Sequence, residues 1–160
     1  MAQIEKTAKM IRLSDTELTI ANPAEDIRGR AVVDRDGEDL GEVDDLLIDE
    51  PEKRVRWLEV ASGGFLGLGK TKFLLPVEAI IWISDDTVYV HQTRQYIAGA
   101  PHYDPDLIHQ EAGEKGYYGE RGYYGDVYQY YGYPPYWTPG AVYPPYPYYG
   151  EEERVPREVP

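Results

Sequence analysis

The sequence predicts a mainly β protein: a small barrel of about six strands, then a short helix and a disordered Tyr/Gly/Pro-rich C-terminal tail. Residues 27–110 hold nearly all the aliphatic side chains of this 160-residue chain, so we expect the core there. Short apolar runs in that region are spaced about ten residues apart between turn signals, which is typical of an all-β barrel or sandwich. Thirteen of the sixteen tyrosines lie within 113–150, among glycine and proline. These observations divide the chain into a polar N-terminal segment (1–25), a barrel domain (26–110) and a low-complexity tail (111–160).

The first strands are predicted around two turns. Asp36-Gly37 lies in the turn 34–39, and Asp-Gly supplies the positive φ that a hairpin turn needs. This turn separates the apolar run 31–33 from 41–49. A second turn at 50–53 leads into 55–60, which is rich in residues that favour strands.

The later strands follow a glycine-rich loop at 63–69. Residues 72–75 predict a strand that ends at Pro76, because proline donates no hydrogen bond to a sheet. Residues 80–83 and 87–91 predict a hairpin across the turn 84–86. One or two helical turns are expected within 92–98, ended by Gly99 and Pro101.

The tail repeats two short motifs. Gly-Tyr-Tyr-Gly begins at Gly116 and Gly122, and Tyr-Pro-Pro-Tyr begins at Tyr133 and Tyr143. Glycine and proline disfavour both helix and strand, so we expect disorder. Three roles stay open: a solubilised spacer, a multivalent segment whose rings stack on one another and on arginine, and a polyproline II ligand. The multivalent role is favoured, and its interaction candidates are Tyr117, Tyr118, Tyr123, Tyr124, Tyr133, Tyr136, Tyr143 and Tyr146.

Composition limits the partners. The net charge of −13 opposes binding to phosphates, so no DNA partner is expected. The absence of cysteine excludes disulfides, thiolate metal sites and cysteine nucleophiles. The longest apolar stretch, 77–83, contains Glu78 and is far shorter than the ~20 residues of a membrane span. Because residues 1–10 also lack an apolar secretory signal, we expect a cytoplasmic chain with no membrane span.

One motif suggests nucleotide binding. Gly64, Gly69, Lys70 and Thr71 fit the P-loop pattern G-x-x-x-x-G-K-[ST], in which backbone N–H groups and the lysine hold phosphates. A P-loop needs a helix N-terminus directly after the loop, whereas residues 72–75 predict a strand. We therefore favour an inter-strand loop and no cofactor, and nucleotide binding is the alternative.

Two clusters have metal-ligating side chains. Asp34, Asp36, Glu38 and Asp39 could hold calcium but lack the order of an EF-hand, so a solvated turn is favoured. His102, Asp104 and His109 fit no common ligand spacing, and surface positions are favoured for them. No metal site and no catalytic residue is predicted.

Trp57 is the interaction candidate of the barrel. It shares one face of its strand with Val55 and Glu59, whereas Leu58 and Val60 point the other way. Both faces are partly apolar and one must fill the barrel. The other could meet a second subunit, the N-terminal segment or the helix near Tyr96. Core packing alone is favoured, and self-association as a homodimer stays open.

Residues 26–106 resemble the PRC-barrel family, named for the cytoplasmic domain of the photosynthetic reaction centre H subunit. The matching stretches are Asp26-Ile27-Arg28-Gly29-Arg30, Gly37, Gly41 to Asp49, Val55 to Val60, Gly63 to Gly69, Leu74 to Val77 and Ala100 to Asp104. The resemblance implies a compact barrel of about six strands without known catalytic residues. It does not extend to the tyrosine-rich tail.

The resemblance also implies a function class. The chain lacks the membrane helix of the H subunit and the second domain of the ribosome maturation factor, and looks more like the stand-alone, stress-associated bacterial members. We therefore expect a non-catalytic interaction protein, not an enzyme, that binds protein partners or itself. The alternative is an accessory factor of a photosynthetic or ribosomal complex.

Overall fold

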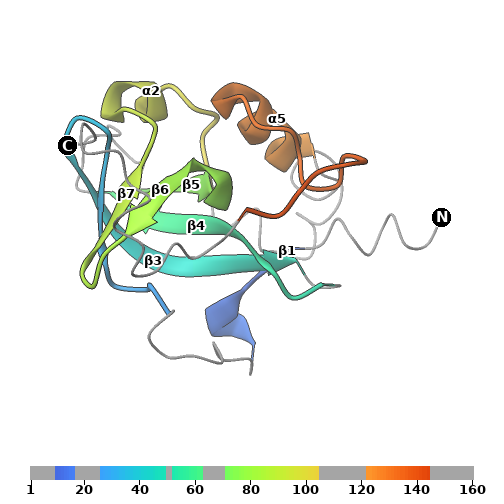
Figure 1. Cartoon of the computed structure of the whole chain (residues 1–160), viewed down its shortest axis with the longest axis horizontal. Helices are drawn as coiled ribbons and strands as arrows, with labels where there is room; N and C mark the ends of the chain where they lie inside the picture. Colours follow the sequence, from blue (N-terminus) through green and yellow to red (C-terminus); the bar gives the residue numbers. More distant parts are fainter. Residues whose placement is uncertain (1–9, 17–25, 50–51, 63–70, 105–121, 145–160) are drawn as a thin grey trace.

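The computed structural model describes residues 10–16, 26–49, 52–62, 71–104 and 122–144 (Figure 1). Within these residues the protein is mainly β, as predicted, with seven strands in one sheet and two α-helices. The elements in chain order are β1 (Met10–Arg12), η1 (Leu13–Asp15), β2 (Ala31–Val33), β3 (Asp39–Asp49), β4 (Val55–Ala61), β5 (Lys72–Pro76), η3 (Val77–Ala79), β6 (Ile80–Ile83), β7 (Thr87–Val90), α2 (Arg94–Ala98) and α5 (Gly122–Tyr131).

The sheet runs in the order β5-β4-β3-β2-β7-β6, with β1 added to β3. The long strand β3 pairs with β4 along one edge, and with β2 and β1 at different points of the other edge. All pairs are antiparallel except β2 with β7. Among the described residues β5 and β6 are not paired with each other, so the sheet does not close into a ring. The short helix η3 connects these two strands in the chain.

The predicted turn at 34–39 is confirmed, and Asp34 organises it. Gly37 has φ +85°, and the Asp34 Oδ1 atom accepts hydrogen bonds from the backbone N–H groups of Asp36 and Glu38, both at 2.8 Å. The other oxygen, Oδ2, accepts from the N–H of Arg94 at 2.8 Å. The turn therefore also holds the start of α2.

Gly41 of β3 lies close against the end of β4. Its φ is +124°, and a Cβ atom there would lie 2.0 Å from the carbonyl oxygen of Ala61. The register between β2 and β3 shifts at the same place, because Val32 faces Gly41 whereas Val33 faces Asp39. A glycine is thus needed for both the backbone conformation and the close approach.

The prediction that the tail forms no helix is wrong for residues 122–131, which form α5 on the same side of the sheet as α2 (Figure 1). The buried residues of α5 follow the 3.6-residue period and so make one apolar face. Glycine in a helix costs only about 1 kcal/mol relative to alanine, so burial of large rings can offset it. The buried residues are Tyr123, Tyr124, Val127, Tyr128 and Tyr131.

Gly132 and Pro134 terminate α5, but the glycine and proline of this segment do not prevent the helix from forming. Gly132 has φ +86°, and its N–H donates to the carbonyl of Gln129 while the Tyr133 N–H donates to that of Tyr128. This is the Schellman arrangement that closes helices, and Pro134 follows it. Residues 111–121 and 145–160 of the predicted disordered tail lie outside the described residues. The three segment boundaries stay predictions.

Candidate functional site

A surface on β4 receives the tyrosine-rich segment of the same chain. Trp57 is fully buried beneath α5, with ring centroids 4.5 Å from Tyr128 and 5.5 Å from Tyr124. The sequence offered three candidates to cover this side of the strand: a second subunit, the N-terminal segment and the helix near Tyr96. The rings that cover Trp57 come instead from α5. The site formed by Arg56 and Trp57 of β4, together with Arg54 just before β4 and Tyr103 after α2, is called the Trp57 face below.

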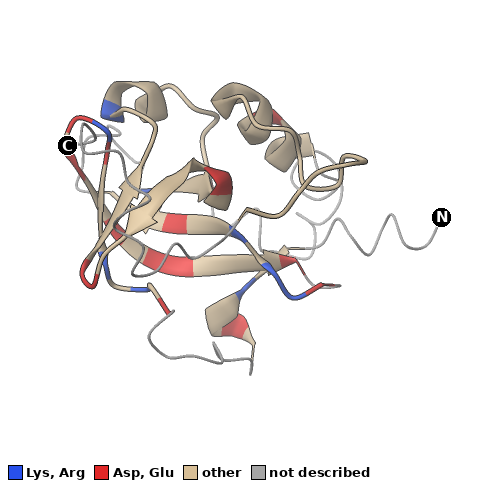
Figure 2. Cartoon of the chain, viewed as in Figure 1, with Lys and Arg blue, Asp and Glu red and all other residues tan. Residues whose placement is uncertain are grey.

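The loop after α5 extends the same contact. Trp137 packs edge-on against Tyr128, with centroids 5.8 Å apart, and Tyr136 packs edge-on against Trp137 at 5.1 Å. The Tyr143 hydroxyl donates to the carbonyl of Val55 at 2.9 Å. The segment 122–144 is therefore fixed to β4 at several separate points. It contains only one charged residue, Asp126, in contrast to the charged turns around it (Figure 2).

Arg56 forms the polar end of the Trp57 face. Its Cζ atom lies 4.2 Å from the Tyr136 ring centroid and 5.1 Å from that of Tyr143. Its Nε donates to Asp49 Oδ2 at 2.6 Å and its Nη2 to Glu52 Oε1 at 3.1 Å. Carboxylates thus occupy the edge of the guanidinium, which leaves its flat faces for aromatic rings.

A cavity of about 260 Å³ lies beside this arginine. Glu78 contributes to its wall, and burial raises the pKa of that carboxyl group. The other lining residues are Glu52, Arg54, Arg56, Tyr136, Ala141, Val142 and Tyr143.

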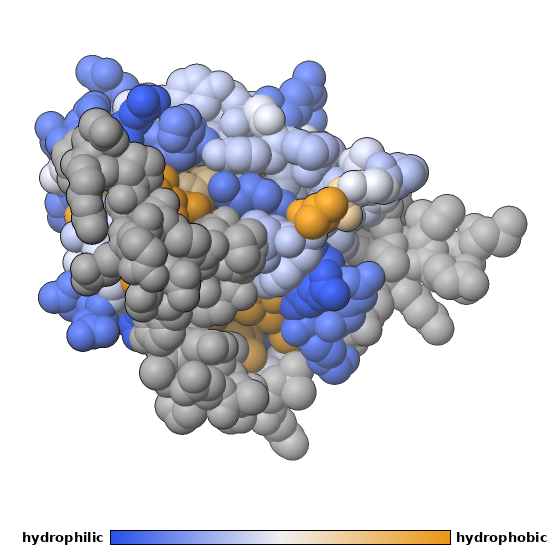
Figure 3. Space-filling view, in the orientation of Figure 1, coloured by the Kyte–Doolittle hydropathy of each residue, from blue (hydrophilic) through white to orange (hydrophobic). Residues whose placement is uncertain are grey.

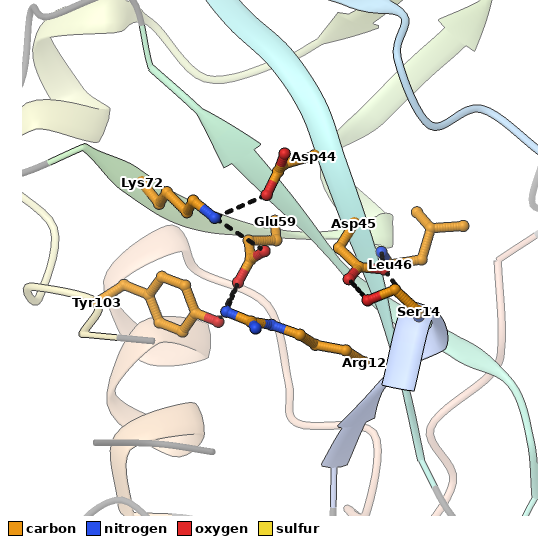
Figure 4. Close-up of polar contacts among 8 residues, drawn as sticks. All are labelled: Arg12, Ser14, Asp44, Asp45, Leu46, Glu59, Lys72 and Tyr103. Carbon is orange, nitrogen blue, oxygen red and sulfur yellow. Dashed lines mark hydrogen bonds and ion pairs between the residues drawn. The ribbon is translucent and has the colours of Figure 1, made fainter. Parts of the chain in front are cut away.

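At the other end of the Trp57 face, Tyr103 contacts the buried carboxylate of Glu59 (Figure 4). The Tyr103 hydroxyl donates to Glu59 Oε2 at 2.5 Å, and Arg12 Nη2 donates to the same oxygen at 3.2 Å. Lys72 Nζ lies 3.8 Å from Glu59 Oε1 and 2.7 Å from Asp44 Oδ2. A fully buried carboxylate is costly unless it is paired and hydrogen-bonded, and here two cations and a phenol surround it.

Electrostatics fix the protonation states around Glu59. Burial, together with the negative charge of Glu59, holds the pKa of Tyr103 far above its usual value, so the phenol stays a neutral donor. The hydrogen bond from Lys72 lowers the pKa of Asp44, and the same bond raises the pKa of Lys72. The ion pair between Asp44 and Lys72 therefore stays charged on both sides at neutral pH.

The N-terminal segment is held to the sheet at a second point. The Ser14 hydroxyl donates to Asp45 Oδ2, and Asp45 Oδ1 accepts from the N–H of Leu46 at 2.8 Å (Figure 4). Together with Arg12, this contact ties β1 and η1 to β3 and β4. Of the three occupants left open for this side of β4, the N-terminal segment reaches Glu59 through Arg12.

The structure separates the tyrosine candidates into three groups. Tyr123 and Tyr124 are buried against the sheet, whereas Tyr133, Tyr136 and Tyr143 are partly buried against the same core. Tyr117, Tyr118 and Tyr146 lie outside the described residues. The rings nearest to Trp57 are therefore not available to a partner while α5 is docked.

The P-loop candidate ends in a strand. Thr71 is exposed, its carbonyl accepts from the N–H of Ser62 at 2.9 Å, and β5 begins at the next residue. The helix N-terminus that would hold phosphates is thus replaced by a strand, which argues against the nucleotide-binding alternative. Gly64, Gly69 and Lys70 lie outside the described residues.

The Asp34 carboxylate of the acidic turn binds backbone N–H groups of its own turn and of α2. Both carboxylate oxygens of Asp34 accept backbone N–H groups, and across the described ranges no three His, Cys, Asp or Glu side chains are grouped to hold a metal ion. His102 is exposed, and His109 lies outside those ranges.

Sequence reasoning missed the two charged residues of β4, Arg56 and Glu59, as parts of a site. A signal was present, because both stand inside a strand whose other residues are apolar. A charged residue in such a strand needs a buried partner, but the partners come from distant segments that the sequence alone does not bring together.

Comparison with known families is consistent with the mainly β fold described above. Residues 21–96 match the model of the PRC-barrel domain, and a comparison with curated proteins found no match. The matched range contains β2 to β7 and ends within α2, so α5 and its loop lie beyond it. No helix in the part of the chain that the structure describes is long and apolar enough to cross a membrane. Residues 21–96 are therefore a PRC-barrel domain, which is a non-enzymatic protein-interaction fold.

Proposed function

We propose that this protein is a non-catalytic interaction protein whose PRC-barrel domain binds aromatic peptide segments on the Trp57 face. One observation carries the proposal: the domain already holds such a segment, residues 122–144 of its own chain. This intramolecular contact supports aromatic side chains as the ligands of the Trp57 face.

The face suits tyrosine for three reasons. Trp57 packs against two tilted tyrosine rings, and each aromatic pair adds about 0.5–1.5 kcal/mol beyond the area it buries. Arg54 and Arg56 lie over rings that follow the helix. The Val55 carbonyl accepts the hydroxyl of Tyr143, so a phenol is favoured over a phenyl ring at that point.

Because α5 docks on the domain of its own chain, the tail has different contacts available in the docked and the undocked states. While α5 is docked, Tyr123 and Tyr124 are buried. When α5 leaves, these rings and Trp57 become available together for weak multivalent contacts with partners. The multivalent tail is therefore proposed for the undocked state.

The test separates the segment from the domain after folding. A site for a specific protease is inserted between residues 104 and 122 of the full chain, the folded protein is cut, and retention of the C-terminal fragment is measured by gel filtration. A labelled peptide of residues 122–144 is then titrated against the cut, fragment-free domain. We expect saturable binding that is lost in Trp57→Ala and retained in Trp82→Ala.

Failure of the peptide to bind the folded, cut domain would overturn the proposal. Circular dichroism of the cut domain before the titration confirms that it is still folded. If Trp57→Ala binds as tightly as the parent domain, the Trp57 face is not the binding surface.

The biological setting rests on the resemblance to stand-alone members of the family. It supports a stress-associated, cytoplasmic protein, and measurement of its abundance and of its cell fraction before and after stress tests both points. The homodimer is tested by light scattering of the intact chain. Capture of partners with and without residues 111–160 tests the alternative of a photosynthetic or ribosomal complex.

A further inference from the structure

Tyr96 of α2 and Tyr130 of α5 form a reciprocal pair. The Tyr96 hydroxyl donates to the carbonyl oxygen of Tyr130 at 2.5 Å, and the Tyr130 hydroxyl donates to the carbonyl oxygen of Tyr96 at 2.6 Å. Their rings are stacked, with centroids 4.5 Å apart and planes 25° from parallel. Each hydroxyl points toward the backbone of the other residue, so the two rings are antiparallel.

This pair lies at the surface. Tyr96 is 44% exposed and Tyr130 is partly exposed. Most of the surrounding surface is hydrophilic (Figure 3), and Tyr96 and Val142 are the exposed large apolar side chains among the described residues. The other rings on α5 face inward. A dissolved oxidant therefore reaches this stack more readily than the buried tyrosines.

We propose that Tyr96 and Tyr130 are a site of oxidative cross-linking, where a one-electron oxidising system driven by peroxide joins the two rings as dityrosine. Each phenol loses one electron and one proton to give a tyrosyl radical, and the protons pass to the surrounding water. The two radicals form a carbon–carbon bond between ring positions ortho to the oxygens, and the hydrogen atoms on those carbons then move to the oxygens. One hydrogen peroxide accepts the two electrons and two protons and becomes two waters.

The geometry supports coupling within one chain. The reciprocal hydrogen bonds hold the rings in contact before oxidation, which favours reaction between them over encounters between molecules. Because the stack is antiparallel, the rings must slide in their planes to bring the ortho carbons together. The partial exposure of both rings leaves room for that movement.

Neighbouring rings are less suited to the reaction. Tyr131 is buried, and its ring stands edge-on to Tyr130 with centroids 5.3 Å apart. Tyr89 stacks on Trp82, so that contact offers no second phenol. The stack of Tyr103 with Tyr123 is buried, with centroids 6.2 Å apart.

The cross-link would fix the tail on the barrel. It joins residues 34 positions apart, and it ties α5 directly to the segment that follows β7. A covalent bond there prevents α5 from leaving, as a disulfide restricts the open states of a loop. Peroxide would therefore hold the Trp57 face in its covered state.

The experiment oxidises the dilute full-length chain with hydrogen peroxide and a haem peroxidase. Monomer is separated from cross-linked oligomers, and dityrosine is measured in the monomer by fluorescence. Peptide mapping by mass spectrometry then locates the bond, through a peptide pair containing Tyr96 and Tyr130 that has lost two hydrogen atoms. We expect this pair to be the main intramolecular product, with slower hydrogen exchange in 122–131 after oxidation.

Two variants decide the result. Tyr130→Phe keeps the stacked ring and the carbonyl that Tyr96 bonds but removes the second phenol, so the monomer should lose its dityrosine signal. Tyr89→Phe is the matched control and should leave the signal unchanged. Dityrosine that maps to other residues, that occurs only in oligomers or that persists in Tyr130→Phe would overturn the proposal. Hydrogen exchange of unoxidised Tyr130→Phe confirms that α5 is still docked.

Discussion

The Tyr103 hydroxyl donates a 2.5 Å hydrogen bond to Glu59, 44 residues earlier in the chain, while the Tyr103 ring lies 6.2 Å, centroid to centroid, from that of Tyr123. Tyr103 therefore contacts the charged centre of β4 through its hydroxyl and the docked helix through its ring. The stability of the sheet and the docking of α5 are coupled through this side chain.

Replacing Tyr103 by phenylalanine should cost more than the same change at Tyr123. Hydrogen bonds to charged groups contribute about 1.5–3 kcal/mol, against about 1 kcal/mol for neutral pairs. Tyr103 donates to a buried carboxylate, whereas Tyr123 donates to the carbonyl of Pro101 at 3.1 Å. Urea unfolding of both variants gives the two free energies, and an equal or reversed order would contradict the prediction.

Trp57→Ala should loosen the whole docked segment. Truncation of a buried tryptophan costs about 3–5 kcal/mol, because contacts are lost and a cavity remains. Trp82→Ala, on the partly exposed stack with Tyr89, should cost only about 1 kcal/mol. Hydrogen exchange of residues 122–131 should accelerate strongly in the first variant alone, and unchanged protection in Trp57→Ala would refute the role of this contact.

Gly41→Ala should be much more harmful than Gly37→Ala. Both positions have positive φ, but the added Cβ atom would overlap the Ala61 carbonyl at Gly41 and meet nothing within 4 Å at Gly37. The left-handed backbone alone costs about 1–2 kcal/mol for a side chain at Gly37. At Gly41 the strain of about 1–3 kcal/mol is added to the overlap, so we expect a loss of at least about 3 kcal/mol. Thermal unfolding of the two variants tests the difference.

Alkaline pH should release the tail. Burial raises the pKa of Tyr143 to about 12 and holds those of Tyr124, Tyr128 and Tyr131 well above their usual range. In the unfolded chain each phenol titrates near about 10. The neutral phenols are thus favoured in the folded state, and their contribution is complete below about pH 10 and is lost as the pH rises through the folded values.

The titration is followed by tyrosinate absorbance and by tryptophan fluorescence. We expect a cooperative rise in absorbance above pH 10 that coincides with exposure of tryptophan. Independent titration of all tyrosines near pH 10, with unchanged fluorescence, would show that the rings of α5 are not buried in solution.

The parts of the fold that depend on local chemistry were predictable from the sequence. Gly37 and Pro76 act on the backbone within a few residues, so the turn and the end of β5 are where we expected them. The addition of β1 to β3 depends on pairing between distant segments and was not predicted. The sequence also did not predict that β5 and β6 stay unpaired among the described residues.

The helix α5 shows where composition misleads. Gly122, Gly125 and Gly132 lower the helical propensity of the segment, and taken alone it lacks enough aliphatic surface for a core. Its tyrosines gain their stability from Trp57 and Tyr103, which lie in other parts of the chain. Propensity therefore favours disorder while tertiary packing favours a helix, and a single sequence does not show that the packing surface exists.

The parallel pairing of β2 with β7 has a consequence for synthesis. Ala31 pairs with Thr87, so β2 of a nascent chain cannot pair with β7 until most of the domain has been made. Contacts between distant segments also slow folding. Trp57 on β4 stays uncovered for longer still, because α5 is translated after every strand of the described sheet. A chaperone that recognises exposed aromatic surface would find its target in that interval.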